Sequence, residues 1–148
     1  MSRELSLLDT PELMVREWHV VYHPREAYRW WGKHLNPAFR HVDLMRPLYY
    51  GPGISDVMWL RVLPVYELLD IEVSLDSRPP WARFPEATVQ KVTAARKLDS
   101  MRSWFDAGPQ TCVEVVKMAL GIRAFFVRTP FQLYKYIKQR NGVLISES

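Results

Sequence analysis

The chain has 148 residues, of which 48% are apolar and 24% are charged, the size and composition of one globular domain covering residues 1–148. Its net charge of +4 is spread over interleaved acids and bases, so the charge alone does not indicate a nucleic-acid partner. A single cysteine excludes an internal disulfide and a cysteine-based zinc site, and it favours a reducing compartment such as the cytoplasm. No apolar stretch approaches the roughly 20 residues that span a bilayer, so we expect no membrane partner.

The first elements expected along the chain are a helix, a strand and a second helix, and prolines set their limits. Pro11 fits the first position of a helix, where its missing N–H is harmless, and Pro24 ends a β-branched and aromatic run. Pro37 stops a segment whose apolar side chains recur at helical spacing. The predicted elements are a short helix at 6–12, a strand at 17–23 and a helix at 25–35.

The middle of the sequence predicts mainly strands. A Gly-Pro-Gly turn at 51–53 lies between two apolar runs, as in an antiparallel hairpin. Farther along, Ile71, Val73 and Leu75 alternate with polar residues, which predicts a half-buried strand. A helix is expected after the proline-rich bend that follows. The ranges are 41–50 and 57–63 for the hairpin strands, 69–75 for the third strand and 86–105 for the helix.

The last third carries two helix start signals. Thr111 and Glu114 predict a capping box, in which the Thr111 hydroxyl accepts from the backbone N–H of residue 114 and the Glu114 carboxylate reaches back to that of residue 111. Gly121 then ends this helix in a left-handed conformation. Thr129, followed by Pro130, opens a second helix that runs to about residue 139. Together the elements predict an α+β fold in which a central antiparallel β-sheet is flanked by helices.

Cys112, at the first position of a predicted helix, is the residue best placed for chemistry. The unpaired backbone N–H groups and the helix dipole at that position favour an anion, and a thiolate is such an anion. Gln110 and the backbone N–H groups around Cys112 could also donate hydrogen bonds to a developing oxyanion. A lone cysteine is also common as a small core residue, so the structural and the catalytic interpretation both stay open.

A nucleophilic cysteine needs a base, and His41 is the best placed of the four histidines. It begins a predicted strand and alternates with Asp43 on one face of the sheet, against which the Cys112 helix could pack. Two acids could orient the imidazole, Asp56 and Asp43, and the sequence does not decide between them.

The remaining histidines are not expected to act in the site. His34 lies at a helix end and is expected in solvent. His19 and His23 share one face of a strand, but they have no acidic or cysteine neighbours at ligand spacing. We therefore expect neither a metal nor another cofactor.

A histidine at the head of a strand is followed by a hairpin and then by Thr-Cys-Val-Glu-Val-Val-Lys-Met-Ala-Leu-Gly-Ile at 111–122, where the cysteine opens a helix. This order resembles that of the circularly permuted papain-like thiol hydrolases related to the NlpC group. Residues 111–122 and 129–134 also resemble small uncharacterised proteins of tailed bacteriophages and prophages. The resemblance implies a permuted papain-like fold that hydrolyses a peptide-like amide bond in the host cytoplasm or the virion. It implies Cys112 as nucleophile and His41 as general base and then acid.

A second interpretation is a non-enzymatic virion or assembly protein of a phage, which contacts other phage structural proteins through aromatic side chains. The chain has six tryptophans and seven tyrosines, and such residues are enriched at interface hot spots. The expected contact points are Trp30-Trp31 and Pro80-Trp81. An oligomer is compatible with this interpretation.

A third interpretation is nucleic-acid binding through basic residues. Lys135 and Lys138 lie on one face of the last predicted helix, as phosphate contacts require, but a solvated helix face gives the same pattern. We do not expect a nucleic-acid partner on this basis. The basic residues concerned are Arg96, Lys97, Arg102, Lys135, Lys138 and Arg140.

Overall fold

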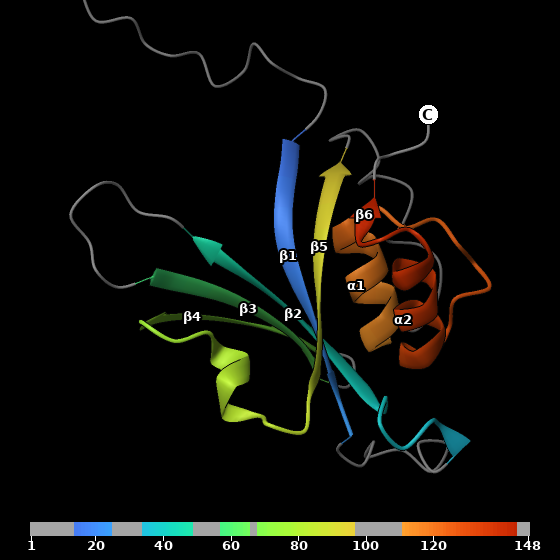
Figure 1. The fold of residues 1–148 in the computed structure, drawn as a ribbon, viewed down its shortest axis with the longest axis horizontal. Coiled ribbons are helices and arrows are strands. Elements are labelled where there is room, and N and C mark those ends of the chain that lie inside the picture. Colours follow the sequence, from blue (N-terminus) through green and yellow to red (C-terminus); the bar gives the residue numbers. More distant parts are fainter. Residues whose placement is uncertain (1–13, 25–33, 49–56, 66–67, 97–110, 145–148) are drawn as a thin grey trace, which may run out of the picture.

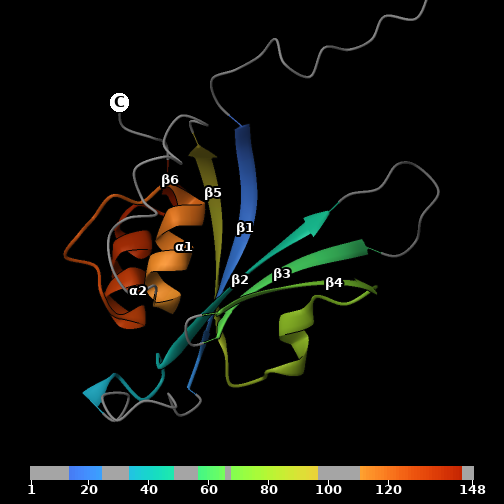
Figure 2. The same cartoon turned by 180° about the vertical axis from the view of Figure 1, so that it is seen from behind.

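The structure, a computed structural model, describes residues 14–24, 34–48, 57–65, 68–96 and 111–144. These residues form one six-stranded sheet with two α-helices packed on one of its faces (Figures 1 and 2). The α+β class expected from the sequence is therefore confirmed. Within the described ranges, neither helix is long and apolar enough to cross a membrane.

Five strands of the sheet are antiparallel to their neighbours, and a short sixth strand pairs in parallel with β5 at one edge. The order across the sheet is β4-β3-β2-β1-β5-β6. In chain order the elements are β1 (Met14–His23), β2 (His41–Leu48), β3 (Val57–Val65), β4 (Leu68–Asp76), the 3-10 helix η2 (Pro80–Arg83), β5 (Thr88–Arg96), α1 (Cys112–Leu120), α2 (Pro130–Gln139) and β6 (Val143–Leu144).

The two helices bury the main apolar core against the sheet. On β1, Trp18, Val20 and Tyr22 point towards the helices and alternate with residues that point to the opposite face. Fully burying one large apolar side chain contributes about 1.5–3 kcal/mol, so this shared core holds the helices on the sheet. The other buried members come from β2, β5, the two helices and the loop between the helices: Val42, Leu44, Val92, Ala94, Val113, Val116, Leu120, Ile122, Ala124, Val127, Leu133 and Ile137.

The segment between β4 and β5 covers the opposite face of the sheet. It contains η2 and Phe84. The rings of Trp81 and His19 have centroids 4.4 Å apart, and those of Phe84 and His23 are 4.9 Å apart. Trp59 of β3 packs edge-on against Trp81 at 5.0 Å. The odd-numbered residues of β1 therefore face this segment rather than the helices.

The pairing between β2 and β3 stops before the beginning of β2. Cα pairing of the two strands starts at Leu44 and Val62, so residues 41–43 of β2 pair with β1 but not with β3. Helix α1 contacts both β2 and β3. The unpaired end of β2 is where the candidate site lies.

The predicted strands at 17–23, 57–63 and 69–75 are confirmed as β1, β3 and β4. The predicted strand at 41–50 is confirmed as β2 over residues 41–48, with its antiparallel pairing to β3, and residues 49–50 lie outside the described residues. The predicted helix at 86–105 is wrong over residues 88–96, which form β5. There the buried Val92 and Ala94 alternate with the exposed Lys91, a period of two that fits a strand. The predicted helix at 6–12, residues 25–33 of the next one, the turn at 51–53 and residues 97–105 lie outside the described residues.

The apolar face of β4 is exposed, so the expectation of a half-buried strand was wrong. Ile71, Val73 and Leu75 have 57%, 57% and 66% of their surface exposed. They lie on the outermost strand of the sheet, whereas α1 makes its main strand contacts with β2, β3 and β5. The alternating pattern located the strand, but it carried no information about which layer would cover it.

Both helices begin as predicted, with one difference at the first cap. The Thr111 hydroxyl accepts from the backbone N–H of Glu114 at 3.3 Å, but the Glu114 carboxylate accepts from Nζ of Lys117 at 2.9 Å instead of closing the capping box. Lys117 is buried and also donates to the carbonyl of Val127 at 3.1 Å, so the carboxylate neutralises a buried cation. At α2, Thr129 forms the complete capping box, and the glycine after α1 is left-handed with φ 73°, as predicted.

Candidate functional site

Cys112 is the first residue of α1, and its side chain is partly buried. The preceding residue, Thr111, caps the helix and satisfies one of the backbone N–H groups that a helix start leaves unpaired. The other N–H groups of the first turn and the helix dipole favour negative charge at this position.

His41 is the first residue of β2 and interacts with both an acid and the cysteine. Its Nε2 lies 2.8 Å from Oδ1 of Asp43, two residues farther along the same strand. Cys112 lies close enough to the His41 ring to help raise its pKa. His41 thus lies between Asp43 and Cys112. Asp43 itself points to the sheet face opposite α1, because its strand neighbours Val42 and Leu44 point into the core under the helices, so the expectation that the Cys112 helix packs on the face of Asp43 was wrong.

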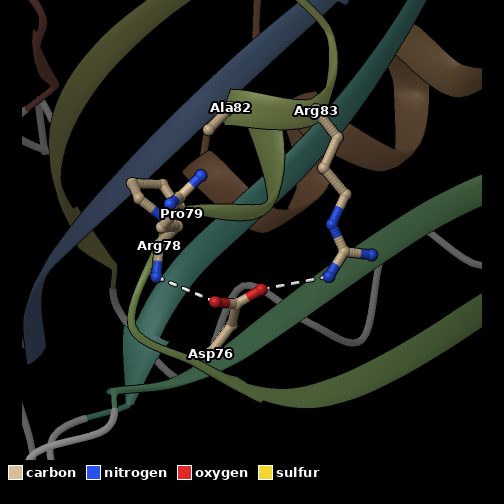
Figure 3. A pocket seen from close by; sticks show the side chains of 5 residues that line it. All are labelled: Asp76, Arg78, Pro79, Ala82 and Arg83. Carbon is tan, nitrogen blue, oxygen red and sulfur yellow. Dashed lines mark hydrogen bonds and ion pairs between the residues drawn. The ribbon is translucent and has the colours of Figure 1, made fainter.

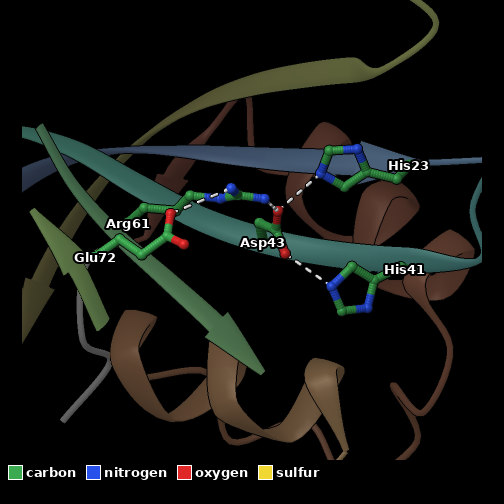
Figure 4. A network of polar contacts seen from close by, with 5 residues as sticks. All are labelled: His23, His41, Asp43, Arg61 and Glu72. Carbon is green, nitrogen blue, oxygen red and sulfur yellow. Dashed lines mark hydrogen bonds and ion pairs between the residues drawn. The ribbon is translucent and has the colours of Figure 1, made fainter. Parts of the chain in front are cut away.

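Asp43 is buried, with 1% of its side chain exposed, and it accepts three side-chain hydrogen bonds (Figure 4). Oδ1 accepts from His41, whereas Oδ2 accepts from Nε2 of His23 at 2.9 Å and from Nη2 of Arg61 at 2.7 Å. Arg61 also lies 3.4 Å from the Glu72 carboxylate of β4. A buried carboxylate is costly unless it is paired, and donors from β1, β2 and β3 provide this pairing.

These contacts set the charges of the site. Burial by itself raises the pKa of Asp43, but the hydrogen bonds that it accepts, led by that from His23, bring the pKa well below its ordinary value. Burial by itself lowers the pKa of His41, but hydrogen bonds and attraction from Asp43 and Cys112 raise it to about 9. At neutral pH the carboxylate is therefore ionised and the imidazole is protonated.

The ionised Asp43 also fixes which ring nitrogens carry hydrogen. A carboxylate only accepts hydrogen bonds, so Nε2 of His41 and Nε2 of His23, which face it, must both be N–H donors. For His41 this leaves Nδ1 as the nitrogen that can exchange a proton with the thiol. The two imidazole rings are stacked with centroids 6.0 Å apart.

His23 and Arg61 are members of this network that the sequence did not assign to the site. His23 was considered only as a metal ligand, yet the register of β1 and β2 places it directly opposite His41. Arg61 lies on β3 and reaches Asp43 of the neighbouring strand. Alternation along β1 and β2 could have placed the two histidines on one face, but only the strand pairing shows that they are neighbours.

Two of the predicted site residues, Asp56 and Gln110, lie outside the described residues, so their roles stay predictions. Of the two acids considered for orienting His41, Asp43 is the one found beside it. His34 is exposed. His19 packs against tryptophan rings, and burial is the main reason why its pKa lies below the ordinary value.

A hollow of about 300 Å³ lies at the surface between β4 and η2 (Figure 3). Its one carboxylate, that of Asp76, accepts from the backbone N–H of Arg78 and from Nη2 of Arg83, both at 3.0 Å. Because both oxygens of this carboxylate are already paired and the lining holds no Cys, Ser, Lys or His, the hollow is not a candidate for catalysis. Its lining residues are Asp76, Arg78, Pro79, Ala82 and Arg83.

Among the described residues, no group of three His, Cys, Asp or Glu side chains is placed to hold a metal ion. Comparison of the chain with protein-family models, with curated proteins and with solved structures found no match. The function must therefore be inferred from the chemistry of the site itself.

Proposed function

We propose that this protein is a thiol hydrolase of the permuted papain-like type, with Cys112 as nucleophile and His41 as general base and acid. Asp43 holds the imidazole in place. The observation that carries the proposal is the hydrogen bond of 2.8 Å between His41 and a buried carboxylate, next to a cysteine at a helix start. A nucleophile, a base and a group that orients the base form the arrangement that activates a thiol.

The proposed substrate is a peptide-like amide bond, and the proposed setting is a phage or prophage protein in the host cytoplasm or the virion. The order of the elements supports the permuted papain-like assignment, because the histidine strand β2 precedes the cysteine helix α1 in the chain. The resemblance of residues 111–122 and 129–134 to small phage proteins supports the proposed origin.

The reaction starts from a thiolate and an imidazolium, a pair that the raised pKa of His41 favours. The thiolate of Cys112 adds to the carbonyl carbon of the amide, and the negative charge moves to the carbonyl oxygen. Backbone N–H groups at the start of α1 are the donors available to this oxyanion. His41 then transfers its proton to the leaving nitrogen, the C–N bond breaks, and a thioester on Cys112 remains.

Water completes the turnover. The neutral His41 takes a proton from a water molecule as the water oxygen adds to the thioester carbonyl. The C–S bond then breaks, the carboxylic acid leaves, and the thiolate and imidazolium are restored. Asp43 stays ionised throughout, because its part is to accept the Nε2–H of His41 and to stabilise the imidazolium.

Acylation by p-nitrophenyl acetate tests the proposal, since this small ester reports on a nucleophilic thiol without knowledge of the natural substrate. We expect rapid release of p-nitrophenolate and an acetyl group on Cys112 in the intact mass spectrum. Cys112→Ser should abolish both signals. His41→Ala should slow the acylation near neutral pH by about a hundredfold or more, the usual contribution of a general base.

The exposed His34 provides the matched control, because His34→Ala removes a histidine that lies outside the network. This variant should acylate like the wild-type protein. Equal acylation rates of the His41→Ala and His34→Ala variants would remove the base from the mechanism and overturn the proposal. Circular dichroism of each variant confirms that the fold is retained.

A second candidate function is that of a non-enzymatic virion or assembly protein. The observation that favours it is the exposed apolar row of β4, formed by Ile71, Val73 and Leu75 on the outermost strand. An outer strand with an apolar face can pair with a strand of a partner. Light scattering of the wild-type protein and of Val73→Lys tests this candidate, which requires an oligomer or complex that the substitution disrupts.

Pro80-Trp81, one of the two aromatic contact points predicted from the sequence, lies in η2 and not on β4. Trp81 packs against two other rings, and Pro80 is buried. Trp30-Trp31 lies outside the described residues. The second candidate therefore rests on β4, whereas the first rests on the Cys112 site.

A further inference from the structure

The loop that joins α1 to α2 presents two neighbouring phenylalanines to solvent. Phe125 and Phe126 have 79% and 59% of their surface exposed. In Figures 1 and 2 this loop, coloured orange to red, projects from the outer side of the helices, away from the sheet. Exposed apolar surface of this kind marks an interaction site when it is contiguous, as it is in this pair of rings, whose centroids are 5.9 Å apart.

Buried neighbours on both sides hold the two rings outward. Ala124 and Val127 are 9% and 1% exposed, and the N–H of Val127 donates to the carbonyl of Ala124 at 3.2 Å. Phe125 and Phe126 are therefore the central residues of a tight turn. The buried Lys117 of α1 stabilises this turn, because its Nζ donates to the Val127 carbonyl at 3.1 Å. Central turn positions usually carry Gly, Pro, Asn, Asp or Ser, so the turn itself does not call for two phenylalanines.

The stretch of sequence around these rings is basic, and the carboxylate of Glu114, which lies beside the turn, is paired with the buried Lys117. Between residues 115 and 146 the sequence contains no Asp or Glu. The Phe126 ring lies 6.1 Å from that of Tyr136, and the Arg140 guanidinium lies 3.6 Å from the Tyr136 ring centroid, which links the apolar tip to the basic residues. The exposed cations of this stretch are Arg123, Arg128, Lys135, Lys138 and Arg140.

We propose that this loop binds the surface of an anionic lipid bilayer. Phe125 and Phe126 enter the boundary between headgroups and acyl chains, and the exposed arginines and lysines around them contact lipid phosphates. An apolar tip combined with basic residues is the pattern by which proteins bind such surfaces without spanning them. The expectation of no membrane partner rested on the lack of a stretch long enough to span a bilayer, and binding to a bilayer surface does not require such a stretch.

The geometry of the rings favours a bilayer over a nucleic acid. Proteins that bind single strands stack bases on the faces of aromatic rings along a positively charged groove. Here the two ring planes are inclined at 82° to each other on a projecting turn, which offers no common stacking platform. An outward-pointing pair of rings can instead enter a soft apolar layer.

Cosedimentation with large unilamellar vesicles tests the proposal on the full chain. The vesicles consist of phosphatidylcholine alone or of phosphatidylcholine mixed with phosphatidylglycerol. We expect binding to the anionic vesicles, reduced by salt, and little binding to the neutral ones. The double variant Phe125→Ser and Phe126→Ser should bind at least about tenfold more weakly, and Arg123→Gln with Arg128→Gln about tenfold more weakly.

Exposed apolar residues elsewhere provide the matched control. The double variant Ile71→Ser and Val73→Ser removes two exposed apolar side chains from β4 and should bind vesicles like the wild-type protein. Acylation of Cys112 is measured on the same samples and should be unchanged in the loop variants, so the bilayer proposal and the hydrolase proposal can fail independently.

Three outcomes overturn the bilayer proposal. The first is no binding to anionic vesicles, and the second is binding that survives the loss of both phenylalanines. The third is a gel shift of single- or double-stranded DNA that the Arg123 and Arg128 substitutions abolish, while anionic vesicles do not bind. This last result assigns the basic surface to a nucleic acid.

Discussion

The His41 imidazole and the Asp43 carboxylate are joined by a hydrogen bond of 2.8 Å between Nε2 and Oδ1 within a single strand. Residues two positions apart on a strand point to the same face, so β2 itself brings the two side chains together. The other donors to the carboxylate, His23 and Arg61, come from neighbouring strands and fix its orientation. Local sequence thus creates the pair, and the sheet holds it in place.

Replacing Asp43 by Asn should lower the pKa of His41 from about 9 towards its ordinary value, because the substitution removes the charge that favours the imidazolium. The thiolate then loses its protonated partner, and alkylation of Cys112 by iodoacetamide near neutral pH should slow by about tenfold or more. NMR titration of the His41 ring and the pH dependence of alkylation measure the two effects. The exposed Asp70 is the matched control, since Asp70→Asn should change neither.

Stability should depend on pH through the same pair. The pKa of His41 is raised by folding from 6.5 to about 9, so its stabilising effect is complete below about pH 6.5 and is lost as the pH rises through about 9. The pKa of Asp43 is lowered by folding, so its contribution is present above pH 3.8 and is lost as the pH falls below that value. Urea unfolding across this range should show a plateau between about pH 4 and 6.5.

His41→Gln separates the two contributions. It should flatten the fall in unfolding free energy above pH 6.5 and leave the acid limb in place, because Asp43 keeps its hydrogen bonds from His23 and Arg61. If the unfolding free energy of this variant still fell above pH 6.5 with the wild-type slope, a group other than His41 would cause that fall.

The caps of the two helices form a matched pair. Thr111→Ala and Thr129→Ala each remove a threonine hydroxyl that accepts a backbone N–H, and each should cost about 1 kcal/mol of unfolding free energy. Only Thr111→Ala should also slow the acylation of Cys112, because it alters the helix start that faces the thiol. Urea unfolding and p-nitrophenyl acetate kinetics on both variants check this, and equal acylation rates would contradict it.

Sequence patterns predicted the strands β1 to β4 and both helices because alternation, helix caps and the terminating glycine are local signals. The strand β5 was missed, since the stretch 86–105 is rich in residues that favour helices, and its long pairing with β1 overrides this preference. The exposure of Phe125 and Phe126 could not be predicted either. In a sequence, exposed and buried phenylalanines look the same.

Some residues of the candidate site could also be predicted from local sequence, and others could not. Cys112 and His41 were singled out from local features, a helix cap and a strand start. Asp43 was one of two acids left open, because choosing between them needs the position of a side chain relative to the imidazole. His23 and Arg61 joined the network only through the register of β1, β2 and β3, which depends on contacts between residues far apart in the chain.

Two left-handed glycines, one after α1 and one after α2, test how tightly the turn after α2 packs against β5. Gly121 and Gly142 have φ angles of 73° and 70°, so alanine at either position should cost about 1 kcal/mol in backbone strain. At Gly121 an added Cβ would meet nothing within 4 Å, whereas at Gly142 it would lie 2.5 Å from the carbonyl oxygen of Lys91.

The Lys91 carbonyl oxygen belongs to β5, and the Thr93 N–H of the same strand donates to the Gly142 carbonyl at 2.8 Å. Gly142→Ala must therefore push the turn away from the sheet and should cost about 3 kcal/mol in urea unfolding, clearly more than Gly121→Ala. If the two variants lost the same unfolding free energy, the turn could move away from β5 without destabilising the protein, which would contradict this prediction.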